Sequence, residues 1–364
     1  MVKFDEIISA SLEWTATVLF RPFSPKKWLI LTFIALMAGS ISGGNSNFSS
    51  SDRRHDRKES YAANYDQGKP FQLAKTSTPE RKSVSRGQFR GFFEKPSAGS
   101  VIFLIVLGVI AGVVLLLVLM WFCSRFYFIF LEDTIRNDAS IAKPFKNNKT
   151  IGNSFFKFNL VFLVFIIGII ALIALFGFMS LSGIGAFKTG ASPGAFKVLA
   201  AIFPAILLFI LFLIIVAVVS LIVNDFAIIV MFKDKIKFMP AIKKVLSVLN
   251  LNKLNFLLYI LIKMGLAIVS SIVYTITSLV AVMGLIFPIA VIVGGLYFIF
   301  KVMPGGMHLV FLIVVIFAAV PVFLFLWYCL VCIYLPIAVF FRVFSAKFFG
   351  RLDSRYNLFK YANE

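Results

Sequence analysis

The hydrophobic positions of this chain form long runs, separated by shorter polar stretches rich in lysine and arginine. Three of the runs end on a patch of polar and aromatic residues, at 121–127, 224–226 and 334–336. Phe226 follows Phe126 by 100 residues, and Tyr334 follows Phe226 by 108 residues. A recurrence at this spacing predicts an internal repeat, with three diverged copies of two membrane spans each.

A membrane span needs about 20 consecutive apolar residues. By that criterion we predict an all-α fold, a polytopic transmembrane helical bundle of about six spans with cytoplasmic amphipathic helices at the joints. The predicted spans are 25–45, 101–124, 158–180, 198–222, 254–281 and 309–335. The fifth apolar run continues to residue 302 and contains Gly284 and Pro288, so residues 284–302 are predicted to form a separate element that is re-entrant or lies at the interface. The alternative is a seventh span, with one terminus outside.

Amphipathic segments form the predicted joints. Residues 4–19 place apolar side chains at helical spacing on one face. The members of that face are Phe4, Ile7, Ile8, Leu12, Thr15 and Leu19. Residues 138–149 supply the second joint, and 240–250 the third, in which Pro240 opens the helix and Asn250 or Asn252 closes it. The stripe of the third joint consists of Ile242, Val245, Leu246 and Leu249.

The predicted organisation has five parts. They are an N-terminal amphipathic helix at 1–24, the first span at 25–45, a basic polar extracytoplasmic insertion at 46–99, the membrane bundle at 100–345 and a basic cytoplasmic tail at 346–364. The insertion has few apolar side chains with which to form a core, which favours a mobile tether. Its basic and aromatic residues are also candidates for contact with anionic lipid or a partner protein. These candidates are Arg53, Arg54, Arg57, Lys58, Phe92 and Phe93.

Composition supports the membrane class. The 364 residues are 60% hydrophobic and 14% charged, whereas about a quarter of the residues in soluble domains are charged. The net charge of +20 would suit a nucleic-acid partner, but the positive-inside rule explains basic stretches that border spans, so no nucleic acid is expected. Lysine and arginine gather at 132–157, 233–253 and 342–360, which places these stretches and both termini in the cytoplasm.

Charged residues inside predicted spans are costly and are therefore candidates for function. Three are present, Arg125, Asp225 and Lys263. Asp225 and Lys263 belong to consecutive spans that meet on the cytoplasmic side, so an ion pair between them is geometrically possible. Such a pair would line a polar cavity or would only hold helices together, and both interpretations stay open. Trp28 and Trp121 are candidates for the lipid interface, where tryptophan is enriched.

Catalytic machinery is not indicated. The two histidines, His55 and His308, have no cysteines or carboxylates beside them at the spacing of metal ligands. Cys329 and Cys332 form a C-x-x-C inside a predicted span, where small packing residues are the ordinary interpretation. Neither a Walker A loop nor a G-x-S-x-G sequence is present. We therefore predict that the protein is not an enzyme and that it has neither a cofactor nor a metal.

Several short segments occur in a distinctive order. They are Arg21-Pro22-Phe23, Lys26-Lys27-Trp28-Leu29, a Gly43-Gly44 turn before the insertion, Ser124-Arg125-Phe126 through Leu131, and Asn224-Asp225-Phe226. In this order the chain resembles a group of uncharacterised bacterial multi-span membrane proteins. That group is related to the membrane portion associated with some glycerophosphodiester phosphodiesterases. The resemblance covers nearly the whole chain and implies location in the bacterial cytoplasmic (inner) membrane. The phosphodiesterase chemistry does not carry over, because it needs a soluble domain with histidines and carboxylates around a metal.

These observations favour a non-enzymatic integral membrane protein that acts as an accessory or scaffold component. It would bind partner membrane proteins, further copies of itself, or lipids, anionic lipids among them. The alternative is a transporter or lipid-translocating protein with a polar cavity near Asp225 and Lys263. A hydrated cleft that reaches the middle of the bilayer would favour the alternative, and a solid bundle would favour the scaffold.

Overall fold

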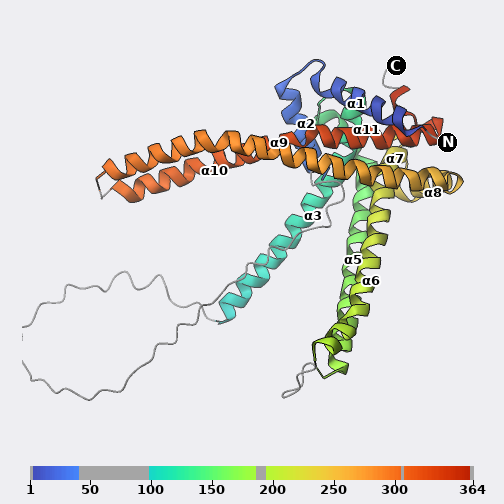
Figure 1. Cartoon of the computed structure of the whole chain (residues 1–364), viewed down its shortest axis with the longest axis horizontal. Coiled ribbons are helices and arrows are strands. Elements are labelled where there is room, and N and C mark those ends of the chain that lie inside the picture. The colour runs from blue at the N-terminus through green and yellow to red at the C-terminus, as the bar shows by residue number, and fades with distance from the viewer. Residues whose placement is uncertain (1–2, 41–97, 186–193, 305–306, 361–364) are drawn as a thin grey trace, which may run out of the picture. The chain divides into compact units, whose positions relative to one another are not determined.

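The computed structural model describes residues 3–40, 98–185, 194–304 and 307–360, and these residues form helices and connecting turns without a strand. Figure 1 shows the helices in chain order. They are α1 Phe4–Phe20, α2 Pro25–Met37, α3 Ala98–Arg136, α4 Ala142–Asn147, α5 Lys149–Gly183, α6 Ala195–Ile222, the π-helix η2 Val223–Ala227, α7 Ile228–Asp234, α8 Phe238–Leu251, α9 Lys253–Val302, α10 His308–Ile333, α11 Leu335–Leu352 and the 3-10 turns η4 Ser354–Tyr356 and η5 Leu358–Lys360. The predicted all-α class is confirmed.

The chain divides into two compact units. One comprises Met1–Ser46 with Val118–Glu364, and the other comprises Asn47–Leu117. In the second unit the described residues, 98–117, belong to the first half of α3. The basic insertion predicted at 46–99 lies almost wholly outside the described residues, and so do its six candidate contact residues.

Five of the described helical segments are long and apolar enough to cross a membrane. They are Val101–Arg136, Lys149–Gly183, Ala195–Asp234, Lys253–Val302 and His308–Leu352. The shortest of them has 35 residues, about 50 Å at 1.5 Å per residue, whereas the hydrocarbon core of a bilayer is about 30 Å thick. The chain is therefore an integral membrane protein, and each long helix has residues to spare beyond the bilayer.

The region of the first predicted span, 25–45, begins as a short helix. The Ser24 side chain accepts a hydrogen bond from the Lys27 amide, and Pro25 occupies the first turn, as the sequence indicates. The helix α2 then ends at Met37 after 13 residues, and Gly39 follows with a left-handed φ of 64°. Thirteen residues extend about 20 Å, which is less than a span needs. Residues 41–45 lie outside the described residues, so this first span stays a prediction.

The prediction of a separate element at 284–302 is wrong, because α9 continues through these residues without a break. The helix has 50 residues and contains Pro288 in its interior. A proline removes one backbone hydrogen bond from a helix, and long apolar helices tolerate this loss. The following turn leads into α10, which packs against α9 as the second half of a hairpin. The helices α5 and α6 form a similar hairpin and run side by side (Figure 1).

Buried side chains gather around α11, in a region that we call the joint core. One apolar cluster connects α11 with α1, with η2 and α8, and with the start of α9. A second cluster connects α11 with α2 and with the end of α3. The basic tail predicted from residue 346 begins inside α11, where Ala346, Phe348 and Phe349 are fully buried or nearly so.

The amphipathic helices α1 and α8 pack into the joint core with faces slightly different from those predicted. In α1 the buried face contains Ile7, Ser11 and Thr15, whereas Leu12 is 56% exposed. The two hydroxyl groups fit this face because each donates a hydrogen bond to the carbonyl four residues earlier. In α8 Val245 and Leu249 are buried as predicted, but Leu246 is 51% exposed.

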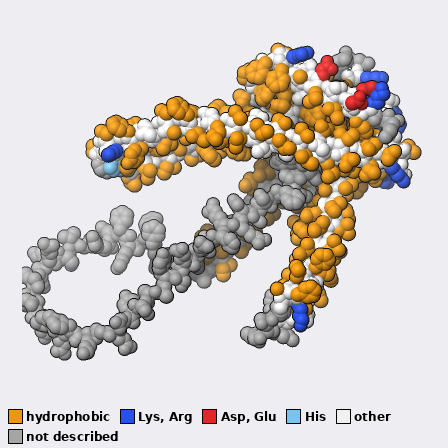
Figure 2. Space-filling view, viewed as in Figure 1, with side chains coloured by type: hydrophobic (Ala, Val, Ile, Leu, Met, Phe, Trp, Pro, Cys, Tyr) orange, Lys and Arg blue, Asp and Glu red, His pale blue; other side chains and the backbone are white. Residues whose placement is uncertain are grey.

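Outside the joint core the long helices are exposed. In four of the five candidate spans the most apolar stretch contains no buried residue, and in Ala195–Asp234 the buried share is 17%. Figure 2 shows hydrophobic side chains along α5, α6, α9 and α10, with most of the visible acidic and basic side chains over the joint core. Dense burial begins near the three polar-aromatic patches of the sequence, at Ser124 in α3, at Val223 in η2 and at Val331 in α10. Before these points α6 has only three buried residues, Ala205, Phe212 and Val216. These patches therefore mark where the long helices enter the joint core.

Candidate functional site

Asp225 lies in the π-helix η2, which joins α6 to α7. A π-helix accommodates an extra residue in a helical turn and often occurs at functional sites. Asp225, Phe226 and Ala227 are buried there, and Val223 is buried beside them. The widened turn thus introduces a carboxylate into the apolar joint core.

The ion pair that was predicted as possible between Asp225 and Lys263 is present. The Lys263 ammonium donates a hydrogen bond to Oδ2 of Asp225, and the Tyr259 hydroxyl donates to the same oxygen at 2.8 Å. Tyr259 and Lys263 lie four residues apart, so α9 presents both donors from one face. The charge of the buried carboxylate is therefore balanced and hydrogen-bonded.

Tyr259 connects this pair to α11. Its hydroxyl lies 2.8 Å from Oγ of Ser345, and the Ser345 hydroxyl also lies 2.8 Å from the carbonyl of Phe341. The Tyr259 ring is fully buried and stacks on Phe348, with ring centroids 4.4 Å apart. Neither Tyr259 nor Ser345 was singled out in the sequence, although Tyr259 precedes Lys263 by one helical turn.

Arg342 is a further buried cation beside this network. Its Nη1 donates to the carbonyl of Asn224 at 2.8 Å, and its guanidinium lies 5.7 Å from the ring centroid of Phe130. The sequence interpretation missed Arg342, since it counted this arginine among the basic residues after the last span. Its position among Phe340, Phe341 and Phe344 was the available signal, because a basic residue inside an apolar run is usually paired.

Arg125 lies in a different cluster, formed with α4 and α5. Its guanidinium stacks over the rings of Trp121 and Phe145, at 4.0 Å and 4.7 Å from their centroids. One Nη donates to Oδ1 of Asn153 at 3.0 Å, and the Trp121 indole donates to the same oxygen at 3.2 Å. The absence of a side chain on Gly152 leaves room for Arg125, since a Cβ there would lie 2.7 Å from Cγ of Arg125.

A polar cavity lies where three long segments end. The Asn148 side chain donates to Oε2 of Glu132 at 2.8 Å and accepts from the Lys235 ammonium at 2.9 Å. Arg136 forms an ion pair with Oε1 of Glu132 at 3.5 Å. Glu132, Arg136 and Lys235 border a cavity of about 470 Å³, to which Asn147 and the start of α5, at Thr150 and Ile151, also contribute.

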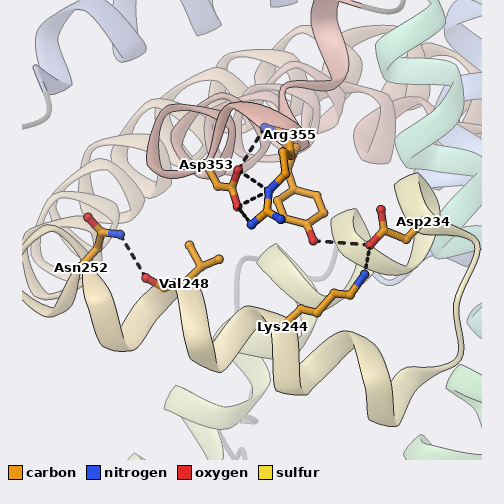
Figure 3. A network of polar contacts seen from close by, with 7 residues as sticks. Asp234, Lys244, Val248, Asn252, Asp353 and Arg355 are labelled. Atoms are coloured by element: carbon orange, nitrogen blue, oxygen red, sulfur yellow. Dashed lines mark hydrogen bonds and ion pairs between the residues drawn. The ribbon is translucent and has the colours of Figure 1, made fainter.

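A second polar network fixes the C-terminal turns on α7 and α8 (Figure 3). Oδ2 of Asp234 accepts hydrogen bonds from Lys244 at 2.5 Å and from the Tyr356 hydroxyl at 3.4 Å. The hydrogen bond to Asp234 raises the pKa of Lys244. Asp353 caps η4 by accepting from the Arg355 amide at 3.1 Å, and the bonds from the Arg355 side chain lower the pKa of Asp353.

The other candidate residues have ordinary structural partners. The Trp28 indole donates to the carbonyl of Leu19 at 2.8 Å, and Trp28 packs edge to face against Phe20. His308 lies 3.0 Å from the carbonyl of Met303 and stacks on Phe300 at the turn between α9 and α10. The three cysteines are free thiols, and within the described ranges no group of three or more histidine, cysteine or acidic side chains could hold a metal.

The structure thus brings Asp225 and Lys263 together and leaves Arg125 in a cluster of its own. The partners that connect the pair to the rest of the protein, Tyr259, Ser345 and Arg342, come from α9 and α11. Chemically, the arrangement can hold charge inside an apolar core and fix the mutual positions of helix ends.

Comparison with curated proteins found no match, and comparison with solved structures found none either. Scanning against protein families gave a match over residues 4–359, which covers the joint core and all five long segments. The chain accordingly belongs to the family of unknown function DUF7544.

Proposed function

We propose that the protein is a non-enzymatic accessory or scaffold component of the membrane, which binds lipids or the spans of partner proteins along its exposed helices. The observation that supports this proposal most is the contrast in burial. The helix ends are packed into the joint core, whereas the apolar stretches of the long helices bury almost nothing within the chain. Helix faces of this kind have to be covered by lipid or by other helices.

The proposal also covers the location of the protein in the cell and the internal repeat of its helices. The protein would lie in the bacterial cytoplasmic membrane with both termini in the cytoplasm, in agreement with the basic stretches that border the long helices. This orientation requires residues 25–45 to cross the membrane in addition to the five long helices. The order of helices supports the internal repeat, since a short helix precedes a pair of longer ones at α4, α5 and α6 and again at α8, α9 and α10. The relation to proteins associated with glycerophosphodiester phosphodiesterases stays a prediction from the resemblance.

Native mass spectrometry and site-specific photocrosslinking test this function together. A photoreactive residue at Phe317, which is 83% exposed on α10, should crosslink to lipid or to a second protein in the membrane. The same residue at the buried Phe344 should crosslink only within the chain. A protein that stays monomeric and retains no lipid in gentle detergent, with no crosslink from Phe317, would contradict the scaffold.

Transport through the membrane is the second candidate function. It is favoured by the buried Asp225 carboxylate, which lies in a π-helix inside one long apolar segment and is paired with Lys263 in another. A transporter would lose flux in proteoliposomes on the substitution Asp225→Asn, even at a temperature where the variant is folded. A scaffold with the same substitution would lose stability, while its binding of lipid or partner at a permissive temperature would persist.

A further inference from the structure

The polar cavity at the ends of α3, α5 and α7 has the chemistry of an anion site. Its lining comprises Glu132, Arg136, Asn147, Thr150, Ile151 and Lys235. A volume of about 470 Å³ falls within the usual range of small-molecule sites, about 300–1,000 Å³. The Arg136 side chain is 66% exposed at its border, so the cavity is open to entering ligands.

The balance of charge in the cavity is positive. Both oxygens of the single lining carboxylate, Glu132, are already engaged, one by Asn148 and the other by Arg136. The Lys235 ammonium donates to Asn148, and in the part of the chain that the structure describes no carboxylate lies within 4.0 Å of it. Burial lowers the pKa of Lys235, so its positive charge is held at a cost that a bound anion would offset.

The backbone at Lys235 is left-handed. Lys235 ends α7 with a left-handed φ of 52°, a conformation that glycine adopts freely and lysine adopts only with strain. The strained residue extends its ammonium over the ring of Phe232, 4.3 Å from the centroid, and onto Asn148. Helices commonly end on a left-handed residue, and glycine adopts this conformation at lower cost than lysine, so the Lys235 side chain can be removed without loss of the helix end.

The beginning of α5 adds hydrogen-bond donors. Asn148 precedes the helix but does not cap it with its side chain, which is occupied by Glu132 and Lys235 instead. The first helical hydrogen bond is donated by Gly152, so the amides of Thr150 and Ile151 have no partner within the helix. Both residues border the cavity, and the Thr150 hydroxyl is a further donor.

We propose that this cavity binds a phosphate group, held by the ammonium of Lys235, the guanidinium of Arg136 and the first-turn donors of α5. The phosphate belongs either to a small soluble phosphomonoester or to the phosphodiester of a lipid headgroup, since both present anionic non-bridging oxygens. The proposal stands on the cavity and does not depend on the scaffold function.

Binding to the purified full-length protein in neutral detergent, measured by calorimetry at constant ionic strength, tests the site. The soluble probes are inorganic phosphate and glycerol 3-phosphate, and the lipid probe is a nanodisc of phosphatidylglycerol compared with one of phosphatidylcholine. Binding of glycerol 3-phosphate would assign the site to a soluble phosphate. Selective binding of the phosphatidylglycerol nanodisc alone would assign it to a lipid headgroup, and either outcome supports the proposal.

The decisive variant is Lys235→Gly, which removes the ammonium and relieves the backbone strain at once. We expect about tenfold weaker binding of the probe, because a hydrogen bond to a charged group is lost. The unfolding temperature should stay the same or rise, so the loss cannot be attributed to misfolding. Thr150→Val, a nearly isosteric change, should weaken binding about threefold for the loss of one neutral donor.

Two control variants isolate the cause. Among the described residues, Asn137 is the other non-glycine residue with a left-handed φ, 58°, and it is not part of the cavity lining. Asn137→Gly makes the same backbone change there and should leave the affinity for the probe unchanged. Lys143→Gln removes one exposed positive charge from α4 and should change affinity less than twofold. Equal binding by the wild type and Lys235→Gly, or no binding of any probe by the wild type, would overturn the phosphate site.

Discussion

Gly152 and Gly168 lie on the same helix, α5, in opposite surroundings. A Cβ added to Gly152 would lie 2.7 Å from the Arg125 side chain, whereas a Cβ added to Gly168 would meet no atom within 4 Å. The first glycine belongs to the joint core and the second to an exposed apolar stretch. Comparing the two regions shows that this chain specifies side-chain packing at the ends of its long helices and leaves their middle parts almost without packing among the described residues.

Aromatic residues should give the largest difference between the two regions. Phe348 is fully buried and stacks on Tyr259, so Phe348→Ala should lower the free energy of unfolding by about 3–5 kcal/mol. Phe317 is exposed on α10, and Phe317→Ala should cost less than about 1 kcal/mol. Unfolding in mixed micelles measures both variants, and equal losses would mean that α10 is packed as tightly as α11.

The Asp225–Lys263 pair should give the next largest effect. Asp225→Asn or Lys263→Ala leaves one charge without its partner in the joint core, and each should cost about 3 kcal/mol. The double variant should lose clearly less than the two single losses together, because both remove the same interaction. Strictly additive losses in the unfolding experiment would show that the two residues act independently.

The two glycines provide a smaller effect with a change of sign. Gly152→Ala should destabilise the protein by about 1–3 kcal/mol, since Arg125 has to move away from Trp121 and Phe145. Gly168→Ala should be neutral or stabilising by up to about 1 kcal/mol, because alanine favours the helix and space is free. A destabilising Gly168→Ala in the native membrane, but not in detergent, would reveal a partner helix on that face.

Asp353 should give the smallest effect, and one that depends on pH. Asp353→Ala removes the cap of η4 and should cost about 1 kcal/mol at pH 7. Because the folded-state pKa of Asp353 is lowered, its contribution is full above the unfolded-state value of about 4 and is lost as the pH falls through the folded-state pKa. The stability difference between wild type and variant should therefore shrink on acidification, and a constant difference from pH 7 to pH 2 would contradict this account.

Local patterns in the sequence predicted much of this organisation. The Ser24-Pro25 start of α2, the Asp225–Lys263 pair and the end of α8 at Asn252 depend on neighbours along one helix or on two consecutive helices. The polar-aromatic patches predict the ends of spans, and dense burial in the structure begins near each of them. These features follow from composition and spacing alone.

The rest depends on contacts between distant segments. Residues 342–360 contain enough lysine and arginine to resemble a tail, yet α11 buries side chains around nearly its whole circumference. Lys347 is compatible with that burial because its ammonium donates to the carbonyl of Ala10, 337 residues earlier. Likewise, Ser11 faces the core because its hydroxyl donates a hydrogen bond to the carbonyl of Ile7 on its own helix, which a count of apolar positions does not detect.

The placement of α11 has a consequence for biogenesis. Its partners include α1 and η2, which both precede it in the chain, so the joint core lacks its central element until the ribosome has translated past Leu352, after α10 has been made. The long apolar helices can enter the membrane as they emerge, well before that. A nascent chain arrested before Leu335 would thus be inserted but would display the uncovered faces of α1 and η2 to chaperones and membrane proteases.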